Sequence, residues 1–469
     1  MEPFLLLFIG VAIVLGGIIW LRLHAFVALM AAAVVVGALT PRENIERALL
    51  AQKRPPAEAA ARAEEPLGAR LGAKFGQTSA NLGLLIAMAS VVGMCLLHGG
   101  GADRIVQSLL GVFGERRAPF VFATSGLVLG VPVFFDTVFL LLIPLARGLA
   151  LRTGRNFLLY VLAIAVGTTM THSLVPPTPG PLFAANALQV DLGVMMLAGF
   201  VLSTLTACVG LAYAWWANRR WPTPVRGIGG NTPSPAEAAG GAAAPLPPLW
   251  LALTPIILPV VLISLGTVAD MTRVTPETLR LIRGVSHPNV ALALAAAVAL
   301  VMLMRGLRGD RERLRSTLAA ALADAGTIIL ITVAGGVFGG MLQETGIGER
   351  IAGLAREHRI GILPLAFAVT ALVRTAQGSA TVAMVTSVGI IGTFATPQTL
   401  GFHPVYLALT IGCASKLTPW MNDSGFWVVS NSAGLSERET LRTMSVMFSL
   451  MGVTGFLLIM IAVSLFPLA

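Results

Sequence analysis

The sequence is poor in charged residues. Asp, Glu, Lys and Arg make up 12% of the 469 residues, whereas a soluble domain carries about 25%. Hydrophobic residues make up 56%, and the mean hydropathy is +0.83. This balance excludes a soluble globular enzyme, and it excludes a disordered chain, which combines low hydrophobicity with high charge. The sequence therefore predicts a polytopic membrane protein, with about ten to fourteen spans of roughly 20 residues each.

Several functional patterns are also missing. The three cysteines, Cys95, Cys208 and Cys413, lie in apolar stretches without metal-type spacing, so we expect them to pack and to bind no metal. No HExxH, P-loop or nucleophile-elbow pattern occurs. No basic run is interleaved with aromatic residues, so the net charge of +10 does not predict nucleic-acid binding. The first apolar stretch, Phe4–Leu21, lacks the flanks of a cleaved signal peptide and is predicted to be a retained span.

An internal repeat organises the rest of the chain. Asn218–Pro247 has the Gly, Ala and Pro content of a linker, and the same order of features occurs on both sides of it. Each copy has a long apolar span, a glycine turn, a short amphipathic helix, two interrupted apolar segments and a closing span. Gly93 and Gly339 are one of several pairs of identical residues at a constant separation. Such a repeat is typical of secondary transporters.

The repeat predicts an all-α polytopic membrane protein with two inverted-topology repeats, each containing a re-entrant helical hairpin and a discontinuous helix. The basic loops Arg147–Arg155 and Arg305–Arg315 should be cytoplasmic, which gives the two copies opposite orientations. The orientation of the 40–74 loop stays open, because this count places its Arg and Lys residues outside. The expected segments are 1–76 (N-terminal spans and polar loop), 77–217 (first repeat, hairpin about 118–148, broken helix about 156–190), 218–247 (linker), 248–315 (intervening spans) and 316–469 (second repeat, hairpin about 360–396, broken helix about 402–430).

Polar interruptions inside the apolar segments mark the candidate site. They read GVPVFFDT (Gly130–Thr137), THSLVPPTPGP (Thr171–Pro181), RTAQGSAT (Arg374–Thr381) and SKLTPWMNDSG (Ser415–Gly425). Non-helical backbone inside a bilayer is tolerated only where it is buried in protein or lines a wet cavity. A helix broken there exposes free N–H groups at its new N-terminus, which suit an anion. We therefore expect the four interruptions to meet at one central anion site.

The interruptions also supply the candidate side chains. For proton coupling they are Asp136, His172 and Asp423, because intramembrane ionisable groups are functional by default and His titrates near neutral pH. Simpler explanations stay open: Asp136 at a hydrated hairpin tip, Arg374 reaching to the interface, and Asp423 as a helix cap or as the ion-pair partner of Lys416 or Arg374. The candidates for substrate contact are Thr171, Ser173, Arg374, Gln377, Gly378, Ser379, Thr381, Asn422, Asp423 and Ser424.

In their order and spacing, the motifs GVPVFFDTVFLLLIPLA, THSLVPPTPGP, RTAQGSATVAMVT and NDSGFW resemble the gluconate:proton symporter (gluconate permease) family of the ion transporter superfamily. The resemblance covers the chain from Phe4 to the C-terminus. It implies uptake of a sugar acid such as gluconate, coupled to inward proton movement, by two inverted halves that meet at the substrate. The chain departs from the family at Thr178 (usually His), at Pro419 and Trp420 (usually Ser and His) and at Asp136 (often Glu). The bulky Trp420 predicts a smaller or more apolar acid.

These observations predict a secondary active transporter of the inner (plasma) membrane that takes up a small hydroxylated carboxylate by proton symport with alternating access. A sodium-coupled carboxylate carrier is the alternative. An intramembrane enzyme is less favoured, because His172, Asp136 and Asp423 form no recognisable catalytic set by spacing. We expect no cofactor, with the proton as coupling ion and sodium as the alternative ion. The expected partners are the organic anion and the lipid bilayer, with no nucleic acid, and the mechanism is compatible with a homodimer.

Overall fold

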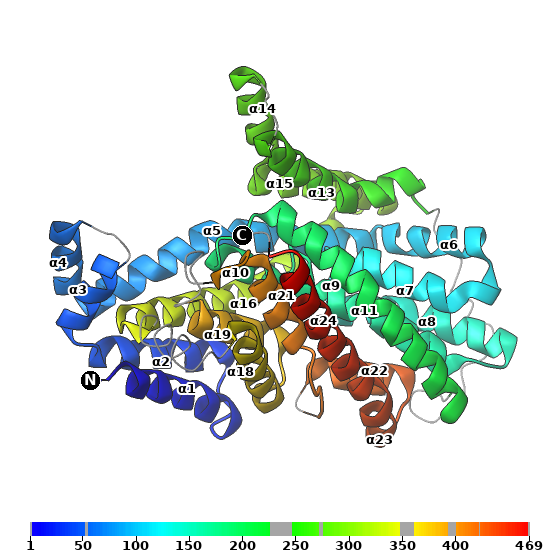
Figure 1. Ribbon diagram of the computed structural model, residues 1–469. Coiled ribbons are helices and arrows are strands. Elements are labelled where there is room, and N and C mark those ends of the chain that lie inside the picture. The colour runs from blue at the N-terminus through cyan, green and yellow to red at the C-terminus, as the bar shows by residue number, and fades with distance from the viewer. Residues whose placement is uncertain are drawn as a thin grey trace.

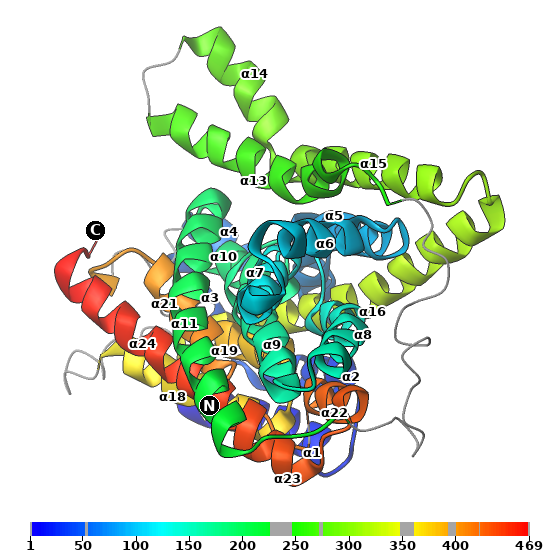
Figure 2. The ribbon, with the colours of Figure 1, turned by 90° about the vertical axis from the view of Figure 1, so that its right-hand side faces the viewer.

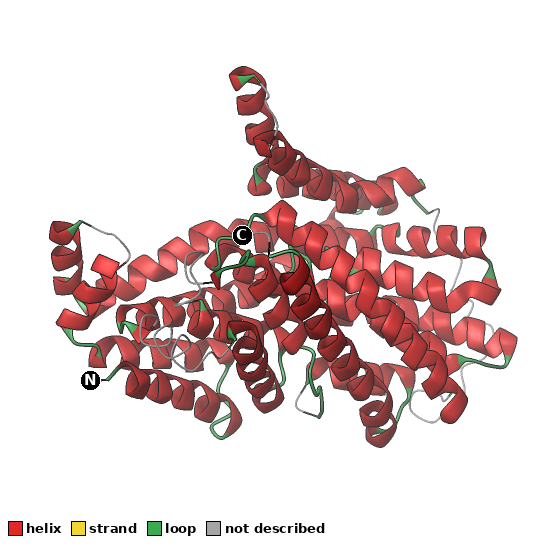
Figure 3. Cartoon of the chain, in the orientation of Figure 1, coloured by secondary structure: helices red, strands yellow, loops and turns green. Residues whose placement is uncertain are grey.

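The computed structural model describes residues 2–51, 55–225, 246–271, 275–347, 361–392, 400–421 and 423–467, and every regular element in these ranges is a helix (Figure 3). Up to the linker the helices are α1 (Pro3–Ile19), α2 (Ala25–Leu39), α3 (Arg42–Ala51), α4 (Pro56–Glu64), α5 (Leu67–His98), α6 (Gly101–Phe113), α7 (Ala118–Leu129), α8 (Phe135–Thr153), α9 (Phe157–Leu174), α10 (Pro179–Ala187) and α11 (Leu192–Arg220). After the linker they are α13 (Leu249–Met271), α14 (Pro276–Ser286), α15 (Pro288–Gly306), α16 (Arg311–Glu344), α18 (Ile362–Gln377), α19 (Ala380–Ile391), α21 (Val405–Ala414), α22 (Ser424–Ala433), α23 (Glu437–Thr440) and α24 (Val446–Leu465).

The length and apolar composition of these helices confirm a multi-span membrane protein. Within the described ranges, seven helical segments are long and apolar enough to cross a bilayer, or eight if α2 and α3, which meet at 99°, form one span. The expectation of ten to fourteen spans is too high for this part of the chain. The reason is that four further apolar helices, including α19 and α21, have only 10–17 residues. Much of the apolar sequence therefore forms helices too short to cross a bilayer.

Two series of helices follow the same order along the chain (Figure 1). The first runs through α5, α6, the α7–α8 pair, the α9–α10 pair and α11. The second runs through α16, the α18–α19 pair, the α21–α22 pair and α24, with residues 348–360 outside the described ranges. Each pair is interrupted at a polar stretch noted in the sequence. The inverted orientation of the two series stays a prediction.

The two broken helices cross at the centre of the molecule. The Ser415 hydroxyl, just after α21, donates to the Ser173 hydroxyl of α9 at 3.3 Å. Gly412 allows this approach, because a Cβ atom there would lie 2.5 Å from the carbonyl oxygen of Ser173. Helix α9 is buried along almost its whole length, so two segments about 240 positions apart in the sequence form one buried crossing.

Helix α16 connects the two series. It packs on α5 and α2 on one side and on α19 on another. Gly335 lies so close to α19 that a Cβ atom would meet Val385 at 1.8 Å. Near its C-terminal end, Glu344 accepts from Arg70 of α5 at 2.6 Å, and both side chains are buried. Helices α13, α14 and α15 form a separate group that contacts the rest through α5, α6 and α11 (Figures 1 and 2).

Candidate functional site

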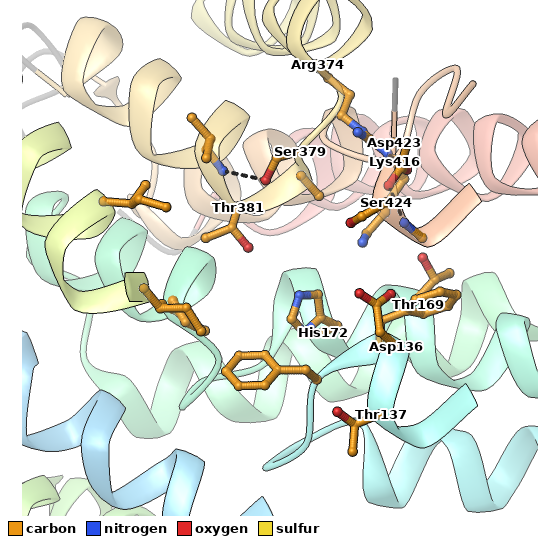
Figure 4. Close-up of a pocket in the computed structure, with 18 of the residues that line it drawn as sticks. Asp136, Thr137, Thr169, His172, Arg374, Ser379, Thr381, Lys416, Asp423 and Ser424 are labelled. Carbon is orange, nitrogen blue, oxygen red and sulfur yellow. Dashed lines mark hydrogen bonds and ion pairs between the residues drawn. The ribbon is translucent and has the colours of Figure 1, made fainter. Parts of the chain in front are cut away.

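Four helices begin at one cavity of about 490 Å³ (Figure 4). They are α8, α10, α19 and α22, and each follows one of the four breaks. Their first residues, Phe135, Pro179, Ala380 and Ser424, all lie in the cavity wall. The first N–H groups of a helix have no partner inside it, so the helix starts contribute partial positive charge. In α10 only Gly180 supplies such a group, because its neighbours Pro179 and Pro181 have no N–H. A cavity surrounded by four helix starts favours an anion.

Both halves of the chain contribute to the wall. Figure 4 shows Asp136 and His172 of the first half opposite Arg374, Lys416 and Asp423 of the second half. The residues in the wall are Phe134, Phe135, Asp136, Thr137, Thr169, His172, Pro179, Asp324, Thr327, Ile328, Ile331, Arg374, Ser379, Ala380, Thr381, Val382, Lys416, Asp423, Ser424, Gly425 and Phe448.

Local sequence explains how α19 and α22 come to start at the cavity. Gly378 ends α18 with a φ of +89°, a left-handed conformation that favours glycine. Ser379 then caps α19, its hydroxyl oxygen accepting from the N–H of Val382 at 3.4 Å. Asp423 caps α22 in the same way, with Oδ1 accepting from the N–H of Gly425 at 2.8 Å. The RTAQGSAT and NDSG motifs are therefore helix-stop and helix-start signals.

One ion pair dominates the second-half side of the cavity. The Arg374 guanidinium donates through Nη2 to Oδ2 of Asp423, and the side chains are only 3% and 13% exposed. Asp423 therefore caps α22 and pairs with Arg374 at the same time. The pair neutralises the charge of Arg374 within the wall, while its Nε and Nη1 atoms lie buried without an acceptor among the described residues.

Three charged groups of the wall are left outside that pair: Lys416, Asp136 and the exposed Asp324. Lys416 is 4% exposed, and its ammonium has no hydrogen bond or ion pair within 4 Å to any residue the structure describes. Asp136, in the first turn of α8, likewise accepts no hydrogen bond within the described ranges. His172 lies beside Phe134, the rings 6.0 Å apart edge to face, and its Nδ1 is buried without a partner.

The structure places seven of the candidate residues in the wall: Asp136, His172, Arg374, Ser379, Thr381, Asp423 and Ser424. Thr171 and Ser173 lie elsewhere, since neither belongs to the wall and both are buried. The Thr171 hydroxyl donates to the carbonyl of Gly167 at 2.9 Å, and that of Ser173 accepts from Ser415. Gly378 acts through its backbone conformation just outside the wall. Asn422 and the side chain of Gln377 lie outside the described residues.

The bulk of Trp420 predicted a narrower cavity, but this side chain does not reach the cavity. It is absent from the wall and 44% exposed. The indole Nε1 donates to the carbonyl of Thr375 at 2.9 Å, which turns the ring toward the end of α18. Thr178 is also directed away from the cavity, because its hydroxyl donates to the carbonyl of Val175 at 2.7 Å. The expectation of a smaller acid therefore has no steric basis in this structure.

Several wall residues are absent from the candidates named from the sequence. Lys416 appears there only as an ion-pair partner of Asp423, although a lysine inside an apolar stretch is itself a signal of function. Thr169, one helical turn before His172 on α9, was visible in the sequence as a polar residue on the same helix face. Asp324 and Thr327 precede the second long apolar stretch of α16. No local signal in the sequence assigns them to the cavity.

Three comparisons describe what the chain is similar to. The family model described as GntP family permease matches residues 63–466. A gluconate permease of Pseudomonas aeruginosa is 32% identical over 393 residues, 82% of this chain and 85% of that protein. The Gnt-II system L-idonate transporter of Escherichia coli K12 is 27% identical over 457 residues, 97% of this chain and 98% of that protein. Among solved structures, the YdaH transporter of Alcanivorax borkumensis has a TM-score of 0.57 at 15% identity, covering 85% of this chain and 88% of that one, so the two share a fold.

Proposed function

Because the chain belongs to the GntP permease family, whose members are membrane transporters and not enzymes, we propose that it takes up a small hydroxylated carboxylate such as gluconate by proton symport. The proposed location is the inner (plasma) membrane. Relatives named for gluconate and for L-idonate suggest the class of aldonic acids. These acids carry one carboxylate and several hydroxyls, and the cavity offers partners for both.

The observation that carries this proposal is the convergence of four helix starts on one cavity. Their partial positive charges support binding of a carboxylate. The hydroxyls of Thr137, Thr169, Thr381 and Ser424 line the same wall and can bond to the hydroxyls of a sugar acid. A volume of about 490 Å³ lies within the usual range of small-molecule sites.

Proton coupling is proposed for Asp136 first. Asp423 is already held by Arg374 and by the cap of α22, and Nδ1 of His172 is buried. Asp136 faces the cavity with its carboxylate free of hydrogen bonds from the described residues. An ionisable group so placed can take up and release a proton without breaking a structural contact.

Alternating access is proposed from the construction of the site. The breaks of both helix series meet at it, so a movement of one series relative to the other would change which side of the membrane the cavity faces. Homodimerisation remains a prediction, testable by the mass of the purified protein in detergent.

Uptake of radiolabelled gluconate into proteoliposomes tests the proposal. We expect accumulation when the outside is more acidic and no dependence on sodium. Arg374→Ala should abolish uptake while the protein remains folded, whereas Arg152→Ala, which removes an exposed ion pair with Glu115, should not. Accumulation driven by a sodium gradient at constant pH would instead identify a sodium-coupled carrier. Failure with a panel of sugar acids and hydroxy acids under either gradient would overturn the proposal.

A further inference from the structure

Lys416 is a buried cation whose charge has no close partner among the residues that the structure describes. Its ammonium lies in the cavity wall, 4% exposed, without a hydrogen bond or ion pair to the described residues. An isolated buried ammonium is costly, so a protein retains one only where a counter-charge can reach it. Arg374, the other cation of the wall, already has Asp423. Lys416 is therefore the wall cation that is available to bind another anion.

Asp136 is the less exposed of two wall carboxylates without an ion pair among the described residues, the other being Asp324. Asp136 projects from the start of α8 toward the second-half side of the cavity, where Lys416 lies (Figure 4). Both side chains line the same cavity, and the separation of their charged atoms exceeds the 4 Å of an ion pair. A substrate carboxylate in this cavity therefore has the Asp136 carboxylate as its competitor for Lys416.

We propose that Lys416 anchors the substrate carboxylate and that Asp136 is its counter-ion in the empty carrier, so that protonation of Asp136 releases Lys416 to the substrate. The inference rests on the proposed function and adds the anchoring residue and the coupling step. In the empty state the Asp136 carboxylate faces the Lys416 ammonium. A proton from water then neutralises Asp136, and the substrate carboxylate takes its place beside Lys416. After release of the substrate on the other side, Asp136 returns its proton to water.

The other ionisable groups near these two residues do not take over either role. Asp423 lies on the same side of the cavity as Lys416 (Figure 4) and acts on it as well, but it is already paired with Arg374. Asp324 of α16 is exposed. His172 of α9 lies beside Asp136 in the same wall (Figure 4), but its Nδ1 is buried without a partner among the described residues. Cys413 lies one turn before Lys416 and is fully buried. The charged and titratable groups that face the pair are thus Arg374, Asp423, Asp324, His172 and Cys413.

Charge counting gives this mechanism a distinctive consequence. The empty site holds the Asp136 carboxylate and the Lys416 ammonium, which sum to zero. The loaded site holds a neutral Asp136 carboxyl, the Lys416 ammonium and the substrate carboxylate, which also sum to zero. The Arg374–Asp423 pair and Asp324 keep the same charge in both states. One full cycle, which carries one proton and one substrate anion, therefore moves no net charge across the membrane. The inference predicts one proton per substrate anion and transport that is independent of the membrane potential.

Proton uptake on binding tests the coupling directly. Purified protein in weakly buffered detergent solution, with a pH-indicator dye, should take up one proton per gluconate bound at a pH at which Asp136 is ionised. Asp136→Asn mimics the neutral carboxyl, so it should still bind gluconate but take up no proton and lose the pH dependence of its affinity. The matched control Glu115→Gln removes an exposed carboxylate and should behave as the natural protein. By linkage, the affinity of the natural protein should fall by about tenfold per pH unit where Asp136 is ionised.

Variants of Lys416 test the anchor. Lys416→Met keeps an apolar side chain of similar length and should weaken gluconate binding by about tenfold to a hundredfold. Lys416→Arg keeps the charge and should retain most of the affinity. If Lys416→Met is poorly folded, the Lys416→Met/Asp136→Asn double variant, which has neither charge, restores the balance and should fold while still binding weakly. Normal gluconate affinity in a folded Lys416→Met variant would overturn the inference.

The membrane potential separates this inference from the proposed function. In proteoliposomes with a potassium diffusion potential set by valinomycin, gluconate uptake at a fixed pH gradient should not change with the potential. Uptake that needs the pH gradient but rises with an inside-negative potential would overturn the pairing of Lys416 with Asp136 and leave proton symport in place. Absence of uptake under any gradient would overturn the proposed function, and this inference with it.

Discussion

Replacing Asp423 by Asn removes one charge of the buried Arg374–Asp423 pair and keeps the cap of α22. The Asn side-chain oxygen can still accept from the N–H of Gly425, as Asp423 Oδ1 does at 2.8 Å, because Asn is an equally good N-cap residue. Arg374, whose side chain is 3% exposed, would then hold its charge with no partner. The change therefore isolates the electrostatic part of the interaction.

The expected cost follows from the burial of the pair. Removing one partner of a buried ion pair costs about 3–5 kcal/mol, because the remaining charge is left desolvated. Asp423→Asn should lie toward the upper end, since Arg374 is almost fully buried. Arg374→Met should cost about 3 kcal/mol, because the 13% exposed Asp423 retains some access to water in the cavity. The double variant carries no charge at this position and should be less destabilised than either single variant.

Reversible unfolding in mixed micelles, followed by tryptophan fluorescence, measures these free energies. The control Arg152→Met breaks an exposed pair of the same chemistry, with side chains 72% and 50% exposed, and should cost less than about 1 kcal/mol. A double variant whose loss equals the sum of the two single losses would refute the reasoning. Additivity would mean that the two side chains stabilise the fold independently and that the pair does not connect α18 to the start of α22.

Three further results are expected from the packing and the cavity wall. Gly335→Ala should destabilise the protein by about 1–3 kcal/mol in the same unfolding assay, because its Cβ would overlap a valine of α19, whereas Gly326→Ala on the same helix meets nothing within 4 Å and should not destabilise. Thr381→Val should raise the Kd for gluconate by about fivefold in isothermal titration, the value of one hydrogen bond. Thr171→Val should leave it unchanged, since that hydroxyl bonds within α9; equal effects would contradict the assignment of the wall. Glu344→Gln should cost about 3–5 kcal/mol of stability, because it leaves Arg70 without a counter-charge and with only the Gly37 carbonyl as its other acceptor. It should not alter gluconate affinity, and a changed Kd would show that the scaffold pair acts on the site.

The positions of the helix breaks could be predicted from local sequence because their causes are local. Proline cannot continue a helix, and Pro176, Pro177 and Pro179 separate α9 from α10. Gly378 followed by Ser379 stops one helix and starts the next. The low charge and high hydropathy of the chain likewise required a membrane, whatever the tertiary arrangement. The four motifs indicate the same family as the family model that matches residues 63–466.

The number of spans could not be predicted in the same way. Hydropathy counts apolar residues but does not distinguish a full crossing from two half-length helices that meet inside the membrane. Chain length allowed ten to fourteen spans, although the motifs already predicted a hairpin at about 360–396 and a broken helix at about 402–430. The structure forms α18, α19 and α21 there, with 10–16 residues each. A helix can end inside the membrane only where neighbouring segments of the protein bury or hydrogen-bond its free backbone groups, so its length depends on tertiary structure.

The sequence alone thus determined the membrane environment, the four breaks and the set of polar residues near them. Tertiary structure decided which of those residues face the cavity. Thr171, His172 and Ser173 are adjacent in sequence, but successive side chains on a helix point about 100° apart, and only His172 lies in the wall. The direction that each takes depends on how α9 crosses α21, which brings together segments distant in the chain. Likewise, Asp423 had two cations within reach by sequence, and packing alone gave it Arg374 and left Lys416 facing Asp136.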